Sequence, residues 1–335
     1  MKTKMLLFLL LAAGALACKR DAAEAPATTG DATLDELNYA IRQNPKDHAL
    51  YASRAQYFYE RNGMDEAIQD LTTALSLDSA NVDYHHLLAD VYMDYFRSRM
   101  ALKTMERAAA LYPERIPTLL KLSEFYLILK QYERSMETID KVLRIDPQNA
   151  EAYFMFGLNF KDQGDVNRAI NSFQQAVEID PKLTDAWINL GQLHAAIDGK
   201  LASRFFDNAI ELDSSNAVAW HAKADYLRDK EDLKGALDLY RKAAIADPQY
   251  EEAYYNAGLM YMELDSVAPA YREFDLALQT NPLYVRAYFF RGYAAELMGN
   301  FKQAKDDYEH AVRMAPEYQE AQDGLSRVNA AAGKK

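Results

Sequence analysis

Proline recurs along the chain at a fixed interval, and this period limits the fold more than any other feature. The interval is 34 residues, shortened once to 33 between Pro181 and Ser214. With serine in two of the places, the series runs Pro45, Ser79, Pro113, Pro147, Pro181, Ser214, Pro248, Pro282 and Pro316. A repeat of this length is one supersecondary unit that buries its apolar face against its neighbours. The period therefore predicts a stacked array.

Alignment of the units shows columns of matched side-chain size. Eight units begin at His48, Val82, Ile116, Ala150, Thr184, Ala217, Glu251 and Val285. Their eighth position is small: Ala55, Ala89, Ser123, Gly157, Gly191, Ala224, Gly258 and Gly292. Their twenty-fourth is bulky: Leu71, Met105, Ile139, Phe173, Phe206, Tyr240, Phe274 and Tyr308. Small side chains let two helices approach closely, and large ones fill the space between neighbours.

These columns resemble the tetratricopeptide repeat, and the resemblance covers residues 32 to about 331. It implies an all-α fold, a right-handed α-α superhelix of about eight helix-turn-helix repeats. We expect an N-terminal capping helix in residues 32–47, the repeats in 48–318, and a C-terminal capping helix and tail in 319–335. Because Gly and Asn accept positive φ, we expect turns at Asn62-Gly63, Gly164-Asp165, Asp198-Gly199 and Gly299-Asn300.

The N-terminus has the three regions of a secretory signal peptide. Lys2 and Lys4 precede an apolar run that ends in small residues, so residues 1–17 are predicted to be a signal peptide. The polar, aperiodic residues 18–31 are predicted to form a flexible tether.

Cys18, the single cysteine of the chain, directly follows this segment. The stretch Ala15-Leu16-Ala17-Cys18 resembles the lipobox of bacterial lipoproteins, although its Leu lies two residues before the Cys instead of three. The resemblance implies a lipid on Cys18 and a protein anchored in the bacterial cell envelope. Lys19, in place of an inner-membrane retention Asp, favours the outer membrane. The alternative is an ordinary A-x-A cleavage site followed by a chance thiol.

Composition and motifs exclude several kinds of chemistry. The chain has 50 acidic and 38 basic residues and a net charge of −12, which argues against nucleic acid as a partner. Its one cysteine excludes a disulfide framework and a Cys-based zinc site. The sequence lacks the phosphate-loop, dinucleotide, zinc-protease and nucleophile-elbow motifs. We therefore expect neither an enzyme nor a bound cofactor.

Two His–Asp pairs share a helix face: His86 with Asp90, and His221 with Asp225. Each pair could contribute to a metal site, but neither has a third ligand nearby in the sequence. We therefore expect surface hydrogen bonds and no bound metal.

In this family the concave face is lined by the second, fifth, ninth and twelfth positions of each first helix. Here this implies groove residues that include His86, Asp90, Phe154, Glu252, Tyr255, Leu259, Met262, Phe289, Tyr293 and Glu296. We expect an apolar groove rimmed by carboxylates, suited to an extended or helical peptide that carries Lys or Arg. For any single aromatic residue, the alternative is packing between helices.

Members of the family that bind chaperones grip a C-terminal carboxylate with Lys and Asn. The Lys positions here hold Ala52, His86, Leu120, Phe154, Ile188, His221, Tyr255 and Phe289, so that clamp is absent. The sequence predicts a membrane-anchored scaffold that binds protein or peptide partners in its groove. The alternative is a lipoprotein that binds glycan or peptidoglycan through exposed aromatic rings.

Overall fold

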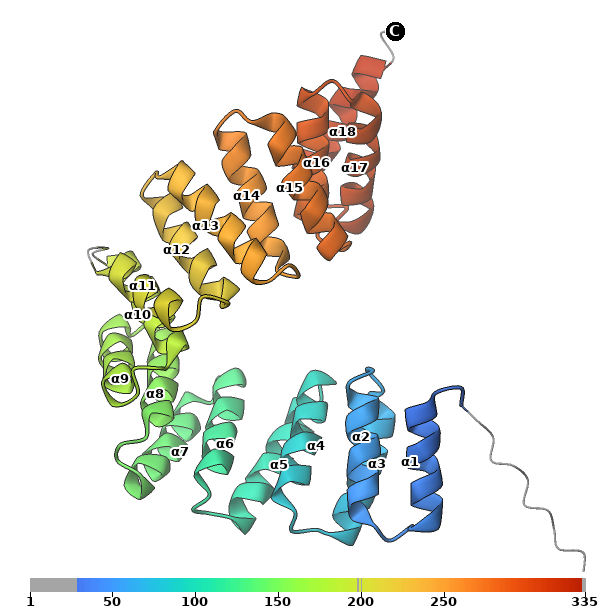
Figure 1. The fold of residues 1–335 in the computed structure, drawn as a ribbon, viewed down its shortest axis with the longest axis vertical. Coiled ribbons are helices and arrows are strands. Elements are labelled where there is room, and N and C mark those ends of the chain that lie inside the picture. Colours follow the sequence, from blue (N-terminus) through green and yellow to red (C-terminus); the bar gives the residue numbers. More distant parts are fainter. Residues whose placement is uncertain (1–28, 198, 200, 333–335) are drawn as a thin grey trace, which may run out of the picture. The chain divides into compact units, whose positions relative to one another are not determined.

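The computed structural model describes residues 29–197, 199 and 201–332, and this part of the chain is all-helical (Figure 1). The first helix of each pair is α2 (His48–Tyr59), α4 (Val82–Asp94), α6 (Ile116–Ile128), α8 (Ala150–Asp162), α10 (Thr184–Ile197), α12 (Ala217–Asp229), α14 (Glu251–Glu263) or α16 (Val285–Leu297). Each begins at the residue where the 34-residue register starts a unit.

The second helices complete the pairs. They are α3 (Met64–Leu77), α5 (Ser98–Leu111), α7 (Tyr132–Ile145), α9 (Val166–Ile179), α11 (Ala202–Leu212), α13 (Leu233–Ala246), α15 (Val267–Thr280) and α17 (Phe301–Met314). Helices α1 (Ala32–Gln43) and α18 (Gln319–Ala332) flank the pairs. Helix α11 has 11 residues where α9 and α13 have 14, so the unit with the deleted residue has a shorter second helix.

The chain forms two compact units, residues 1–104 and 105–335, here called the N-terminal body and the C-terminal body. In the N-terminal body, α1 packs on α2, α2 on α3, and α3 on α4. In the C-terminal body, each helix from α6 to α18 packs on the next. Helices α6 and α8, α10 and α12, and α16 and α18 also touch directly, so the helices of each of these pairs lie side by side.

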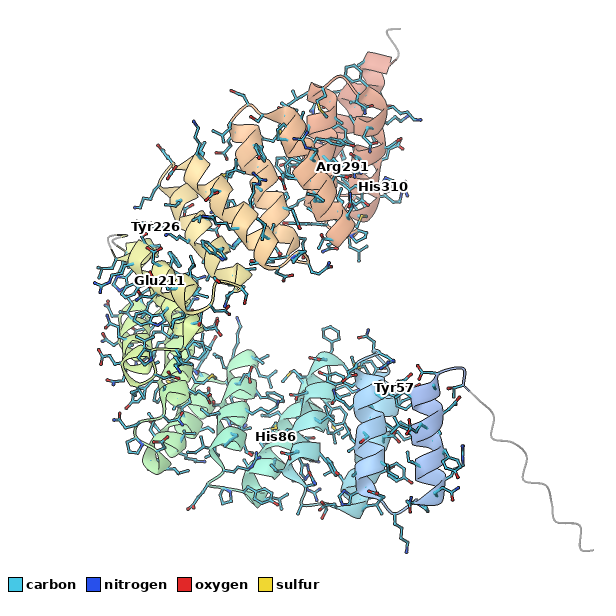
Figure 2. All side chains as sticks on the ribbon, viewed as in Figure 1. Tyr57, His86, Glu211, Tyr226, Arg291 and His310 are labelled. Carbon is cyan, nitrogen blue, oxygen red and sulfur yellow. The ribbon has the colours of Figure 1, made fainter. Side chains whose placement is uncertain are left out.

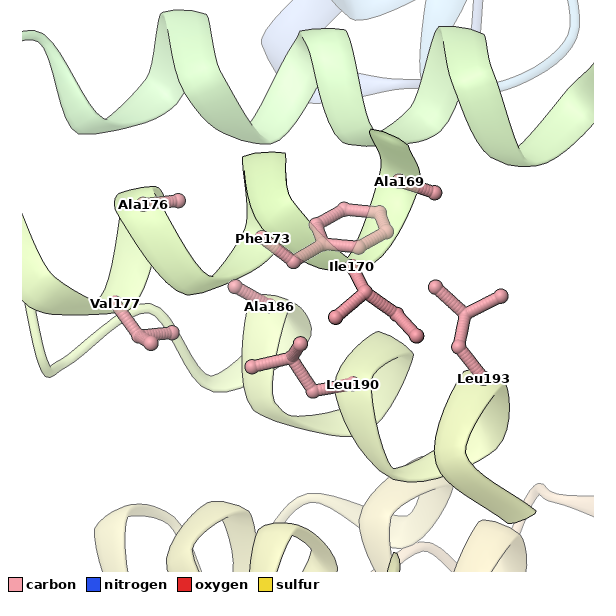
Figure 3. Close-up of a cluster of buried hydrophobic side chains, with 8 residues drawn as sticks. All are labelled: Ala169, Ile170, Phe173, Ala176, Val177, Ala186, Leu190 and Leu193. Carbon is pink, nitrogen blue, oxygen red and sulfur yellow. The ribbon is translucent and has the colours of Figure 1, made fainter. Parts of the chain in front are cut away.

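The size columns describe the actual packing. A Cβ atom added to Gly157 would lie 2.5 Å from the ring of Phe173, and one added to Gly191 would lie 2.5 Å from Phe206. Phe173 is fully buried among small and aliphatic side chains of α9 and α10 (Figure 3). Helix α8 can therefore approach α9 closely only because position eight carries no side chain.

The turn inside each pair contains one residue with positive φ. Asn62, Gly164, Gly199 and Gly299 have this conformation, as their residue types predict. In the other four units the residue is Phe96, Lys130, Glu231 or Asp265, with φ between 54° and 63°. These four turns were not predicted, because Phe, Lys and Glu do not favour the left-handed region and Asp265 has no Gly or Asn beside it. Phe96 is also 95% exposed, so the chain bears a strained, solvent-facing aromatic residue there.

Candidate functional site

Tyr255 lies in the core, so the prediction that it contacts a ligand in the groove is wrong. Its side chain is 3% exposed, and its ring centroid lies 5.9 Å from that of Phe274, 4.9 Å from Tyr284 and 5.8 Å from Phe290. Burial raises the pKa of its hydroxyl to about 12. The Tyr255 ring, at position five of α14, thus fills the space between α14 and the next helix pair. This is the alternative role, packing between helices, that the sequence left open for any single aromatic residue.

Four other predicted groove residues of this region are half-buried: Leu259, Met262, Phe289 and Tyr293. The rings of Phe289 and Tyr293 are parallel, with their centroids 6.4 Å apart. The Phe289 ring also lies beside that of Tyr318, at a centroid distance of 5.2 Å. Within the described part of the chain, the Tyr293 hydroxyl makes no hydrogen bond and is not among the buried unpaired polar atoms, so it is accessible to solvent. Ligand contact by these four side chains remains a prediction.

The carboxylate of Glu296 is already neutralised within the chain. It accepts hydrogen bonds from Nε and Nη2 of Arg327 at 3.0 and 2.9 Å, and from the Tyr308 hydroxyl at 2.7 Å. The hydrogen bonds from Arg327 are the main reason why the pKa of Glu296 lies below its usual range. The expected role of Glu296 in attracting a basic ligand is therefore not supported, because its charge has a partner.

Asp225 is neutralised in a similar way, while Glu252 is not. Burial alone would raise the pKa of Asp225, but hydrogen bonds from His221 and Tyr240 lower it. Its Oδ1 also accepts from Arg228 Nη1 at 2.8 Å. Glu252 at the start of α14 is exposed and forms no ion pair with any described residue, so it differs in this respect from Glu296.

The other predicted residues lie in different surroundings. Phe154 on α8 is half-buried, with its ring 5.5 Å from that of Phe173, so it is partly core. His86 and Asp90 are half-buried on α4 of the N-terminal body, where both have partners (Figure 2). Among the described residues, no three His, Cys, Asp or Glu side chains are grouped to hold a metal ion.

Cys18 and the predicted signal peptide, residues 1–17, lie outside the described residues. None of the helices within the described ranges combines the length and apolar character needed to cross a bilayer.

A second stretch of the same face, formed by α6, α8 and α10, was not singled out from the sequence. A pocket of about 480 Å³ lies there. It is lined by Leu127, Ile128, Lys130, Leu158, Lys161 and Asp162. The Lys161 ammonium donates hydrogen bonds to Asn189 Oδ1 at 2.6 Å and Gln192 Oε1 at 2.9 Å, both on α10. A lysine at a concave position was the available sequence signal, but its partners follow only from the folded structure, in which two α10 side chains lie within hydrogen-bond distance of its ammonium.

An array of antiparallel helix pairs whose first helices share one face is an α-solenoid of the scaffold type, which serves protein–protein contact. Family models for this repeat match most of the region after residue 115. The model described as "TPR repeat" matches residues 157–198, and two described as "Tetratricopeptide repeat" match 116–149 and 285–318, and 198–251 and 221–282. The chain belongs to the tetratricopeptide repeat family.

Solved structures and curated proteins are similar to this chain at low identity. The Cut9-Hcn1 hetero-tetramer of the APC/C contains a chain with a TM-score of 0.54 and 17% identity, covering 88% of this chain and 58% of its own, which shows the fold alone. Anaphase-promoting complex subunit 7 of Dictyostelium discoideum is 22% identical over 68% of this chain and 39% of its own length. BBSome complex member BBS4 of Bos taurus is 22% identical over 84% of this chain and 48% of its own length. The chain thus spans less than half of these two relatives.

Proposed function

We propose that this protein is a non-catalytic scaffold that binds a partner protein or peptide along the first helices of its C-terminal body. The observation that carries the proposal is the row of half-buried apolar side chains on α14 and α16, namely Leu259, Met262, Phe289 and Tyr293. Apolar and aromatic side chains on one face, next to the exposed Glu252, suit a linear segment with apolar anchors. The two relatives described above are named as members of multi-protein complexes, which supports the same kind of role.

We further propose that the scaffold is a lipid-anchored protein of the bacterial envelope. This rests on the signal-peptide pattern of residues 1–17 and on Cys18 at its end. Several acyl chains on one cysteine would give stable anchoring, since each buried CH₂ contributes about 0.8 kcal/mol. Replacing the thiol should therefore release the protein from membranes without changing the repeats.

Fractionation tests the anchor. The Cys18→Ala variant is expected in the soluble fraction, while the parent sediments with membranes after a salt wash and incorporates a labelled fatty acid. A variant that still sediments after the same wash would rule out lipidation as the anchor.

Site-specific crosslinking tests the groove. A photo-crosslinking amino acid is placed at Met262 on the first-helix face or, as a matched control, at Leu276, which is exposed on the second helix α15. We expect the Met262 variant to capture specific proteins in the native envelope that the Leu276 variant does not. Equal products at both positions would contradict the groove assignment. Retention on purified peptidoglycan that Tyr293→Ala abolishes would instead favour the glycan-binding alternative.

A further inference from the structure

Lys161 is a half-buried cation that has no carboxylate partner among the described residues. Its two hydrogen-bond acceptors, Asn189 and Gln192, are neutral amides. An ammonium has three N–H donors, so one remains available. Burial lowers the pKa of Lys161, with no opposing carboxylate to restore it.

Several other partly buried cations among the described residues are paired with acids. Arg54 donates to Asp70 at 2.7 Å in the N-terminal body. In the C-terminal body, Arg291, labelled in Figure 2, donates to Asp307 at 2.5 Å, and Lys223 donates to Asp207. Burying a charge without a counter-charge costs stability. Lys161 therefore differs from these three cations, and a ligand that brings the missing charge would remove the cost.

The same stretch of the groove offers a pocket beside this ammonium, lined by three apolar residues and by Lys130, Lys161 and Asp162. Leu127, Ile128 and Leu158 provide its apolar walls, and the Ile128 side chain is 53% exposed. The stem of Lys161 also lines the pocket, while its ammonium reaches across to α10. The nearby acid Asp162 accepts the Tyr132 hydroxyl at 2.5 Å, so its charge is partly satisfied. The pocket of about 480 Å³ has room for a large aliphatic or aromatic side chain.

From this arrangement we infer that the pocket between α6 and α8, together with Lys161 and Gln192, binds an acidic linear segment of a partner protein. One large apolar side chain enters the pocket, and a carboxylate two or three residues away bonds to the Lys161 ammonium. The separation follows from geometry, since packed helices are about 8–10 Å apart and an extended chain advances about 3.3–3.6 Å per residue. The carboxylate belongs either to Asp or Glu or to a free C-terminus. The inference rests on the proposed scaffold function and adds the chemistry of the ligand.

The experiment uses two random 12-residue phage-display libraries, one with blocked C-termini and one with free C-termini, selected on the purified full chain. We expect enriched peptides with a carboxylate two or three residues from a large apolar residue. Enrichment in both libraries assigns the carboxylate to a side chain, and enrichment in the free-terminus library alone assigns it to the C-terminus. Selection of basic peptides would overturn the inference.

Variants then locate the binding of the enriched peptides, measured by fluorescence anisotropy. Lys161→Gln is expected to weaken binding about tenfold or more, the scale of a charged hydrogen bond. Gln192→Glu, which supplies an internal carboxylate, is expected to weaken it similarly. Lys141→Gln removes an equal charge from the exposed surface of α7 and is expected to have no effect. Circular dichroism and thermal melting confirm that each variant is folded.

The remaining outcomes separate this inference from the proposed function. Peptides that bind equally to Lys161→Gln but lose binding in Met262→Ala would overturn the inference and leave the scaffold function intact. Failure of both libraries to yield any peptide that binds the parent would count against both.

Discussion

Two equivalent positions in the C-terminal body carry opposite charges, and only one of the two charges has an ion-pair partner. Glu296 and Lys161 both occupy position twelve of a first helix, and each reaches the residue 31 places later, which is Arg327 on the flanking helix α18 in one case and Gln192 on α10 in the other. Glu296 meets Arg327 and forms an ion pair, while Lys161 meets Gln192 and keeps its charge uncompensated. The charge that a groove position presents is therefore set by the neighbouring helix and not by the groove residue alone.

The largest expected effect separates core aromatic residues from those presented in the groove. Tyr255→Ala should lower the free energy of unfolding by about 3–5 kcal/mol, because it empties a packed site. Tyr293→Ala should cost less than about 1 kcal/mol, since its half-buried ring leaves no closed cavity. Urea denaturation measures the free energy of unfolding of both variants. Equal losses would mean that Tyr293 is a core residue like Tyr255, and that the groove therefore ends before α16.

A smaller effect tests the ion pair of Glu296. Because its pKa is lowered in the folded state, Glu296 should stabilise the protein above its ordinary pKa of 4.5, and this contribution should disappear as the pH falls below 4.5 through the folded value. Glu296→Gln should therefore lose about 1 kcal/mol at neutral pH. Urea denaturation at neutral and at acid pH measures this, and a loss of equal size at both would show that the charge is not responsible.

The smallest effect tests Lys161. Gln192→Glu should raise the free energy of unfolding by about 0.5–1 kcal/mol at neutral pH, because it gives the ammonium a carboxylate at the same distance across the groove. Gln148→Glu, on an exposed turn, serves as the control for added negative charge. A destabilisation by Gln192→Glu equal to that of the control would indicate that Lys161 needs no counter-charge.

The repeat register was predictable, because it depends on size columns that recur in every unit. The Gly157–Phe173 contact is one example, since a small residue and a large residue 16 places later imply each other. The left-handed turn could be predicted at Gly164 but not at Phe96, where tertiary packing of the pair overrides the residue's preference.

The groove was less predictable, because position five is shared between packing and exposure. Tyr255 and Phe289 occupy the same column, yet Tyr255 is buried by the rings of Tyr284 and Phe290, whereas Phe289 is half-buried. The partner of Glu296 lies on the flanking helix α18, outside the eight units that share the size columns. Net charge and position therefore could not show which carboxylates were already paired.

The most direct test of the contrast between these two charges is an NMR titration of the Lys161 side chain, followed at its Cε and assigned with Lys161→Gln. The account predicts a midpoint below the ordinary lysine pKa of 10.5, because burial without a carboxylate disfavours the ammonium. The same titration in Gln192→Glu should move the midpoint upward. A midpoint at or above 10.5 in the parent would contradict the account, because it would show that Lys161 is ion-paired or solvated like an ordinary surface lysine.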